Sequence, residues 1–219
     1  EETMFRHVFK LLNGCYFEYQ DGKLSIRRYH EVSYHIDEKP TLEEWERRIT
    51  ETFSESVLAH KIADVEVGCF LSSGVDSSYV VKEVSKTADG IKTFSVGYEE
   101  EKYSELPYAQ DFCKAVGLPN ISNKVSADDF FDAASIIQYY LDDPMPNPSE
   151  IPLYFLAKNA AKYVKVVLSG EGADELFGGY PMYLAGMHFD HYAHRVPKPL
   201  RRLAGAAAGK MPPFKGRNF

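Results

Sequence analysis

A serine-rich turn between a predicted strand and a predicted helix carries the first residues that could do chemistry. The apolar run 65–71 is typical of a buried strand, and it ends abruptly at Ser72-Ser73-Gly74. Apolar residues then recur at helical spacing from Val75. Backbone N–H groups and the positive end of a helix dipole converge at such a junction, which predicts an anion site. The side chains add hydroxyl donors and a carboxylate suited to Mg²⁺, from Ser72, Ser77, Ser78 and Asp76.

A second turn of complementary chemistry lies about a hundred residues further on. The apolar run 164–168 predicts another buried strand, and residues 169–180 after it are rich in glycine and carboxylates. By itself the first turn could be an ordinary strand-to-helix connection. In the second turn, Glu175 is best explained as a glutamate in the first turn of a helix, where it complements the helix dipole. Together the turns offer phosphate donors and carboxylates, which a nucleotide site with Mg²⁺ needs because the ion bridges phosphate and protein oxygens.

The two turns together resemble a known family. Residues 72–78 are similar to the pyrophosphate loop of N-type ATP pyrophosphatases, Ser-Gly-Gly-x-Asp-Ser-Ser. With residues 169–180, the chain resembles the synthetase domain of glutamine-hydrolysing asparagine synthetase over roughly 5–183. The resemblance implies an ATP-dependent amide-forming ligase. In that reaction the side-chain carboxylate of aspartate attacks the α-phosphorus of ATP, pyrophosphate leaves, and ammonia displaces AMP to give asparagine.

The resemblance also implies roles for single residues. Asp76 and Asp174 would hold Mg²⁺ and serve as catalytic groups, and Glu171 would take a proton from the ammonia or orient it. Backbone atoms near Leu71 and Val96 would hold the adenine. ATP and Mg²⁺ are thus the expected cofactors. The expected nucleotide-binding set is Leu71, Ser72, Ser73, Gly74, Asp76, Ser77, Ser78, Val96, Ser169 and Gly170.

Two departures from the family pattern bear on activity. Ser73 stands where the family has glycine. A left-handed backbone at this serine would cost about 1–2 kcal/mol, whereas an extended backbone costs little and adds a donor. Gly74 is present, so we expect a competent loop. The family's synthetase domain continues well past the second motif, so we also expect an incomplete domain that binds ATP and Mg²⁺ but turns over poorly or not at all.

The order of the predicted elements favours an α/β fold, a parallel sheet with helices on both faces. The resemblance implies an adenine nucleotide alpha hydrolase-like, Rossmann-like version of that fold. The proline-rich segment 142–148 predicts a loop, and its two adjacent carboxylates suit a substrate pocket and an ordinary loop equally. Strands are expected over 65–71, 91–97, 120–125 and 164–168. Helices are expected after caps at Thr41 (a capping box with Glu44), Ser104, Ser126 and Ser149, and from Val75.

Residues 14–19 and 23–29 predict a β-hairpin, because Asp21-Gly22 between them is a strong hairpin signal. A lone hairpin needs a surface to pack on, and the glutaminase domain of the resembled family ends in such strands. We therefore expect a hairpin remnant of an N-terminal glutaminase domain (1–36), an ATP-pyrophosphatase domain (37–194) and a basic, solvated or disordered tail (195–219).

Composition limits the partners and the compartment. The net charge of the chain is −7, but residues 195–219 hold seven Lys/Arg and no acidic residue. Residues 1–194 therefore carry −7 − 7 = −14, and this acidic body gives no support for nucleic-acid binding. No apolar run approaches the roughly 20 residues of a membrane span. Three separated cysteines favour a reducing interior, so we expect a cytoplasmic protein. Expected partners are ATP, aspartate and ammonia delivered from glutamine by a glutaminase domain, and a homodimer is compatible with these observations.

Two other functions remain open at this point. A β-lactam-forming synthetase shares both motifs and differs mainly in its acyl pocket. From a different class, the chain could be a nucleotide-binding module without catalysis. A tRNA-modifying ATP pyrophosphatase is disfavoured, because the acidic body and the carboxylates at 171 and 174 do not suit it.

Overall fold

The computed structural model describes residues 2–87, 90–144 and 147–209. The chain divides into two units, Glu1–Gly170 and Glu171–Phe219, and each is described by itself. No helix within the described ranges is long and apolar enough to cross a membrane.

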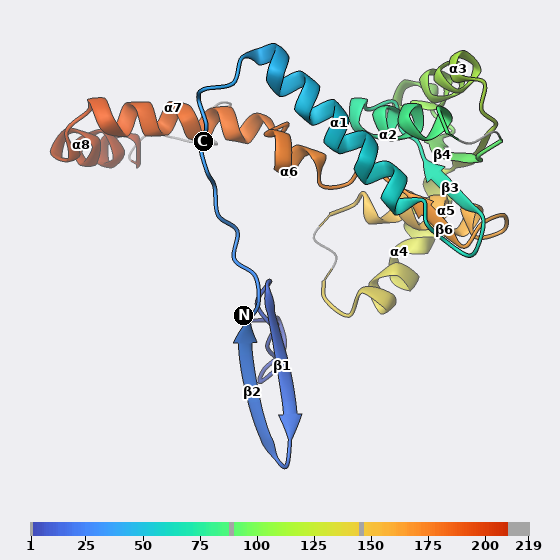
Figure 1. Cartoon of the computed structure of the whole chain (residues 1–219). Helices are drawn as coiled ribbons and strands as arrows, with labels where there is room; N and C mark the ends of the chain where they lie inside the picture. The colour runs from blue at the N-terminus through green and yellow to red at the C-terminus, as the bar shows by residue number, and fades with distance from the viewer. Residues whose placement is uncertain (1, 88–89, 145–146, 210–219) are drawn as a thin grey trace. The chain divides into compact units, whose positions relative to one another are not determined.

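A four-stranded parallel sheet is the centre of the first unit (Figure 1). Its strands are β3 (Val67–Phe70), β4 (Thr93–Tyr98), β5 (Asn120–Val125) and β6 (Val166–Leu168), in the order β5-β4-β3-β6. The chain thus moves outward from β3 to β5 and returns to the other side of β3 with β6. In open α/β sheets ligands bind beyond the carboxyl ends of strands at such a reversal, here between β3 and β6.

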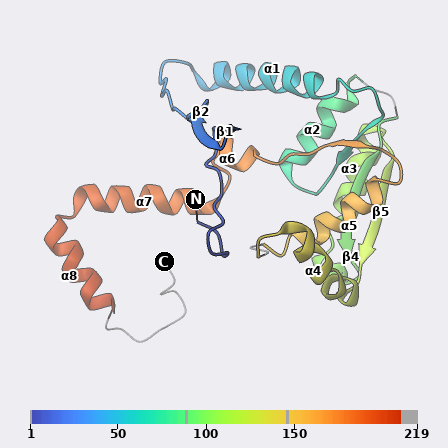
Figure 2. The same cartoon turned by 90° about the horizontal axis from the view of Figure 1, so that it is seen from below.

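Helices cover both faces of this sheet, which confirms the predicted α/β class. One core cluster joins Cys69 and Leu71 of the sheet to α1 (Leu42–His60), α2 (Val75–Ser85) and α3 (Leu106–Val116). A second cluster packs Phe94 against Ala160 of α5 (Glu150–Ala160) and against Val164. Helix α4 (Ala127–Leu141) packs on α5 through Ala133, Ile137 and Ile151 (Figure 2). In β4, Thr93 contacts Cys113 of α3, whereas the next residue, Phe94, packs on the α5 side.

A buried polar network lies under the carboxyl end of β3. Asn120 Nδ2 donates to Thr93 Oγ1 at 3.0 Å and to Ser95 Oγ at 2.9 Å. Ser95 Oγ in turn donates to the Leu71 carbonyl at 2.7 Å. Thr93 and Ser95 are fully buried, so these bonds satisfy groups that water cannot reach. The network fixes Leu71, the last residue before the serine-rich turn.

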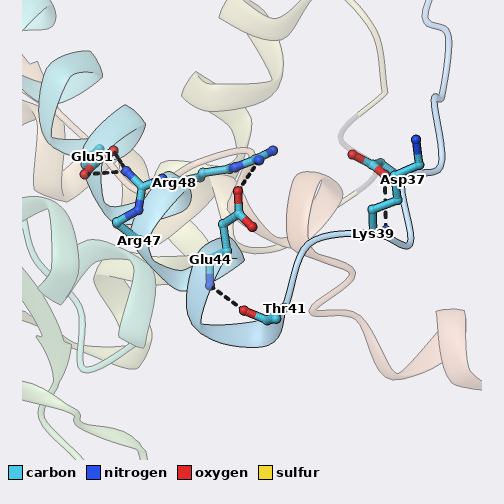
Figure 3. A network of polar contacts seen from close by, with 7 residues as sticks. All are labelled: Asp37, Lys39, Thr41, Glu44, Arg47, Arg48 and Glu51. Carbon is cyan, nitrogen blue, oxygen red and sulfur yellow. Dashed lines mark hydrogen bonds and ion pairs between the residues drawn. The ribbon is translucent and has the colours of Figure 1, made fainter.

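The start of α1 is held by the polar contacts drawn in Figure 3. Thr41 caps the helix as predicted, since its side chain accepts from the Glu44 N–H at 3.2 Å. The predicted capping box is only half formed, because the Glu44 carboxylate pairs with Arg48 one turn later. Arg47 and Glu51 form a second exposed pair at 2.8 Å, and such pairs add little stability.

One predicted cap is wrong: Ser104 follows the 3₁₀ turn η1 (Glu101–Tyr103), and Glu105 is the N-cap of α3. Ser149 is the N-cap of α5 as predicted, but it has helical dihedrals (φ −67°, ψ −13°) and its hydroxyl makes no cap bond. Ser126 does cap α4, in a complete capping box with Asp129. Residues 142–144 and 147–148 lie outside helices and strands, as predicted for this segment. Residues 145 and 146 are outside the described ranges.

The predicted hairpin is confirmed by β1 (Cys15–Gln20) and β2 (Lys23–Arg28), which pair antiparallel. Asp21 and Gly22 have φ of 51° and 75°, and two positive φ angles are the signature of the tight turn that suits a twisted hairpin. The apolar side chains of the hairpin are exposed; Phe17, for example, is 59% accessible.

The second unit is helical in its described part. It contains α6 (Ala173–Phe177), α7 (Pro181–Arg195) and α8 (Lys198–Gly209). Within the predicted solvated or disordered tail, residues 198–209 form a helix, where leucine and a run of alanines favour helix. Residues 210–219 lie outside the described ranges.

Candidate nucleotide-binding site

Sheet pairing brings the beginnings of both predicted turns to one edge. Strands β3 and β6 are direct neighbours, and Cys69 pairs with Leu168. Both strands point the same way, so the chain leaves each of them at the same edge of the sheet. Residues 71–74 and 169–170 therefore start from adjacent positions.

The serine-rich turn is closed by its own hydroxyl groups. The hydroxyl oxygens of Ser72 and Ser77 lie 2.8 Å apart, and the Ser72 N–H donates to Ser77 Oγ at 3.1 Å. The Gly74 N–H donates to Ser72 Oγ at 3.1 Å. These bonds connect the turn to the first turn of α2.

The N-terminus of α2 is suited to an anion. Gly74 is the N-cap in extended conformation (φ −68°, ψ 153°), and no described side chain caps the helix. The first N–H groups of an α-helix have no partner inside the helix, and here they lie beside an exposed turn of small residues. Asp76 is in this first turn, half-buried, where its carboxylate complements the helix dipole. An incoming phosphate would meet N–H and O–H donors, with one carboxylate beside it for a cation.

Ser73 does not strain the loop. It is absent from the described non-glycine residues that have positive φ, so the cost considered for a left-handed serine does not arise. Its hydroxyl donates to Glu105 Oε2 at 2.7 Å, and its N–H lies 3.4 Å from the same oxygen. Serine at this position therefore gains a partner that glycine would lack.

Gly170, the last residue of the first unit, lies directly against the first turn. A Cβ at this position would lie 2.7 Å from the Ser77 nitrogen and 2.9 Å from the carbonyl carbon of Asp76. Both are backbone atoms, so no side-chain rotation could relieve the overlap. Only glycine lets the chain after β6 approach the first turn of α2 this closely.

The second turn is a compact acidic structure of its own. Gly172 (φ 90°) and Gly178 (φ 69°) are left-handed and enclose the short helix α6. The Gly179 N–H donates to the Asp174 carbonyl at 3.0 Å, and a Cβ at 179 would lie 1.9 Å from Asp174 Oδ1. The glycines thus fold the backbone around the Asp174 carboxylate.

Glu175 has a structural partner in this turn. Its carboxylate accepts from the Tyr180 hydroxyl at 2.8 Å. This hydrogen bond, supported by desolvation and nearby acidic charge, raises the pKa of Tyr180 to about 12. The Glu175 carboxylate therefore connects α6 to Tyr180 at the end of the turn, which agrees with a structural rather than a catalytic role.

The first unit gathers most of the predicted nucleotide-binding residues. Leu71 is buried at the end of β3, and Val96 is half-buried on the adjacent strand β4. Ser169 follows β6 directly. Glu171 and Asp174 belong to the second unit. No group of three or more His, Cys, Asp or Glu side chains in the described ranges is arranged to hold a metal.

Two contributors were not foreseen from the sequence. Glu105 reaches the loop from the start of α3, and Ser95 supports Leu71 from within β4. The available signals were the serine at 73, whose hydroxyl requires a partner, and the polar residues in the otherwise apolar strand 93–98. Neither signal names the partner, because both contacts join residues more than 20 positions apart.

The fold and this edge of the sheet define a parallel α/β protein with a serine-rich loop, and with a helix N-terminus that no described side chain caps, at its strand reversal. Comparison with known proteins is more specific. The family model described as asparagine synthase matches residues 48–216, and the chain belongs to this family.

Individual relatives agree with the family match. Asparagine synthetase [glutamine-hydrolyzing] 1 of Bacillus subtilis is 37% identical over 96% of this chain, and a putative asparagine synthetase [glutamine-hydrolyzing] of Mycobacterium bovis is 39% identical over 96%. The chain spans about a third of the length of these relatives (33% of each). Among solved structures, an NH3-dependent NAD synthetase from Campylobacter jejuni aligns at 16% identity with a TM-score of 0.42, over 61% of this chain and 60% of that one.

Proposed function

We propose that the chain is the ATP-using part of an asparagine synthetase, which activates the side-chain carboxylate of aspartate and passes it to ammonia. The carboxylate oxygen bonds to the α-phosphorus of ATP as pyrophosphate leaves. Ammonia then bonds to the carboxyl carbon, and AMP departs with that oxygen. Membership of the asparagine synthase family and the names of the relatives support this reaction over the two alternatives.

The close approach of Gly170 to Asp76 and Ser77 is the observation that carries the proposal. It places the start of the second motif, residues 169–170, beside the first motif at the position where an α/β sheet binds ligands. A serine-rich turn with an unrelated role would not require the backbone of a second, distant motif to be packed against it.

The residues of the first turn would bind the departing pyrophosphate. Their N–H and O–H groups, with the α2 dipole, stabilise negative charge as it collects on that group. The bonds between Ser72, Ser77 and Gly74 hold these donors in place before the substrate arrives. Such preorganisation lowers the barrier, because the groups need not reorder during the reaction.

The residues of the second turn would supply the negative and basic groups. Asp174, with Asp76, would hold Mg²⁺, which neutralises charge on the phosphates when it is bound. Glu171 would orient the ammonia and take its proton. Ser169 and Gly170 would lie along the nucleotide. The donor set fits a hard cation, because it consists of carboxylate oxygens.

Ammonia would come from glutamine through a glutaminase domain. Support comes from the names of the relatives, which describe glutamine-hydrolysing enzymes, and from the exposed apolar side chains of the β1–β2 hairpin. We propose that this hairpin belongs to such a domain, and that the protein acts in the cytoplasm.

The proposal is tested by giving the 219-residue chain ATP, Mg²⁺, aspartate and ammonia, and by measuring AMP and pyrophosphate. Slow turnover is sufficient for this test: we expect both products in equal amounts, and only when aspartate is present. Binding of ATP without AMP formation would support a non-catalytic module. Failure to bind ATP would contradict the proposal outright.

A further inference from the structure

Glu105 contacts the phosphate-binding turn from outside it. The residue is the N-cap of α3, and its Oε2 accepts from the Ser73 hydroxyl at 2.7 Å. The Ser73 N–H lies 3.4 Å from the same oxygen. Glu105 thus connects the turn after β3 to the element that follows β4, 32 positions later in the chain.

The side chains of the turn divide into two sets. Ser72 and Ser77 bond to each other, within the turn. Ser73 bonds to Glu105. A hydrogen bond to an ionised carboxylate is stronger than one between neutral groups, so the outward contact is well suited to hold a segment whose residues are exposed.

We propose that Glu105 is a positioning residue that fixes Ser73, and through it the turn, for the pyrophosphate group. The inference rests on the proposed function and adds a residue to it. Without this bond the turn keeps the contacts of Ser72, Ser77 and Gly74 but loses its only described side-chain tie to α3. An incoming pyrophosphate must then order the turn itself, which reduces affinity.

Two substitutions and a cycle between them test this inference. Glu105→Ala should weaken binding of inorganic pyrophosphate with Mg²⁺ to the 219-residue chain about fivefold, the loss expected for one hydrogen bond. Ser73→Gly removes the hydroxyl partner and restores the residue of the pyrophosphate-loop pattern. In the Ser73→Gly background, Glu105→Ala should have almost no further effect, because the strong bond is already absent. Glu101→Ala, at an exposed acidic residue of η1, is the matched control and should bind as the unchanged chain does.

A second readout separates positioning from folding. Hydrogen exchange of the amides at 72–78 should be faster in Glu105→Ala, whereas exchange in β4 and α3 and the melting temperature stay unchanged. The inference is overturned if Glu105→Ala binds as tightly as the Glu101→Ala control, or if its effect persists in the Ser73→Gly background. Either result would leave the proposed function intact, whereas absence of pyrophosphate binding by the unchanged chain would contradict both.

Discussion

The two glycine-containing turns of this chain present opposite chemical groups. The turn at 72–78 presents donors, and its hydroxyl groups bond to each other at the start of an 11-residue helix. The turn at 169–180 presents carboxylates, and left-handed glycines fold it around the five-residue α6. The first has the chemistry of an anion site and the second that of a cation site. A nucleotide bound with Mg²⁺ needs both.

The glycines of the two turns are required for different structural reasons. Gly170 is needed because another backbone lies against it, and Gly179 because the Asp174 carboxylate does. Gly172 has no neighbour within 4 Å of an added Cβ, and its positive φ is the reason for glycine. A methyl group added at each site therefore disturbs a different part of the proposed mechanism.

The largest effect is expected for Gly170→Ala. The added methyl group would overlap the backbone at Asp76 and Ser77, and forcing extra volume into a packed position costs about 1–3 kcal/mol. We expect ATP binding to weaken about 10- to 100-fold at that cost. Gly186→Ala in α7 is the control: it meets no neighbour and should leave ATP binding unchanged. Equal binding by both variants would show that the turns need not meet.

Gly179→Ala should act on the cation side alone. The methyl group would displace Asp174 Oδ1, and disturbing the support of a metal ligand typically lowers metal affinity about tenfold. The Mg²⁺ concentration needed for half-maximal AMP formation should rise by that factor, while the melting temperature changes little. If the Mg²⁺ dependence is unchanged, Asp174 is not a ligand.

Ser77→Ala should act on the anion side. It removes the bonds to the Ser72 hydroxyl and N–H, which together should weaken pyrophosphate binding about fivefold. Ser85→Ala, at the other end of the same helix, removes a hydroxyl that bonds only to the Lys82 carbonyl. Calorimetric titration of both variants with pyrophosphate compares them directly, and a loss as large in Ser85→Ala would mean that the effect is general to α2.

A smaller, pH-dependent effect is expected beneath the donor turn. Glu83 of α2 is buried, and burial raises its pKa, but hydrogen bonds from Lys86 and Ser54 and the charges of Lys86 and Lys82 outweigh this and lower it. The folded pKa is below the unfolded value, so the ionised glutamate stabilises the fold above the unfolded pKa, and this contribution disappears as the pH falls through the folded pKa.

Glu83→Gln should therefore lower the free energy of unfolding by about 1–2 kcal/mol at pH 7. The difference from the unsubstituted chain should shrink as the pH falls through the folded pKa of Glu83, which is lower than that of an ordinary glutamate. Thermal unfolding across a series of acidic pH values and at pH 7 measures this. A difference that stays constant with pH would show that ionisation of Glu83 does not contribute.

Sequence patterns predicted the sheet and the donor turn because both depend on local rules. Apolar runs gave the parallel strands, and the serine-rich junction at 72–78 gave the helix N-terminus. The cap at Ser104 was wrong because a 3₁₀ turn precedes α3 and moves the N-cap to Glu105, and Ser149 occupies the predicted N-cap position without a side-chain cap bond. The contacts of Glu105 and Ser95 were out of reach, since each depends on the spacing of neighbouring strands.

The second turn marks the other limit of prediction from sequence. Its glycines and carboxylates were recognised as a motif, but the bond between Glu175 and Tyr180 emerged only from the fold of the turn. Likewise, glycine at 170 follows from what lies against it, because its φ is not positive.

The most direct test of the central claim follows one oxygen atom. Aspartate labelled with ¹⁸O in its side-chain carboxylate is incubated with the chain, ATP, Mg²⁺ and ammonia, and the AMP is analysed by mass spectrometry. If the two turns form one site that activates this carboxylate, one ¹⁸O atom is transferred to each AMP. Unlabelled AMP, or ADP and phosphate as the products, would contradict the account.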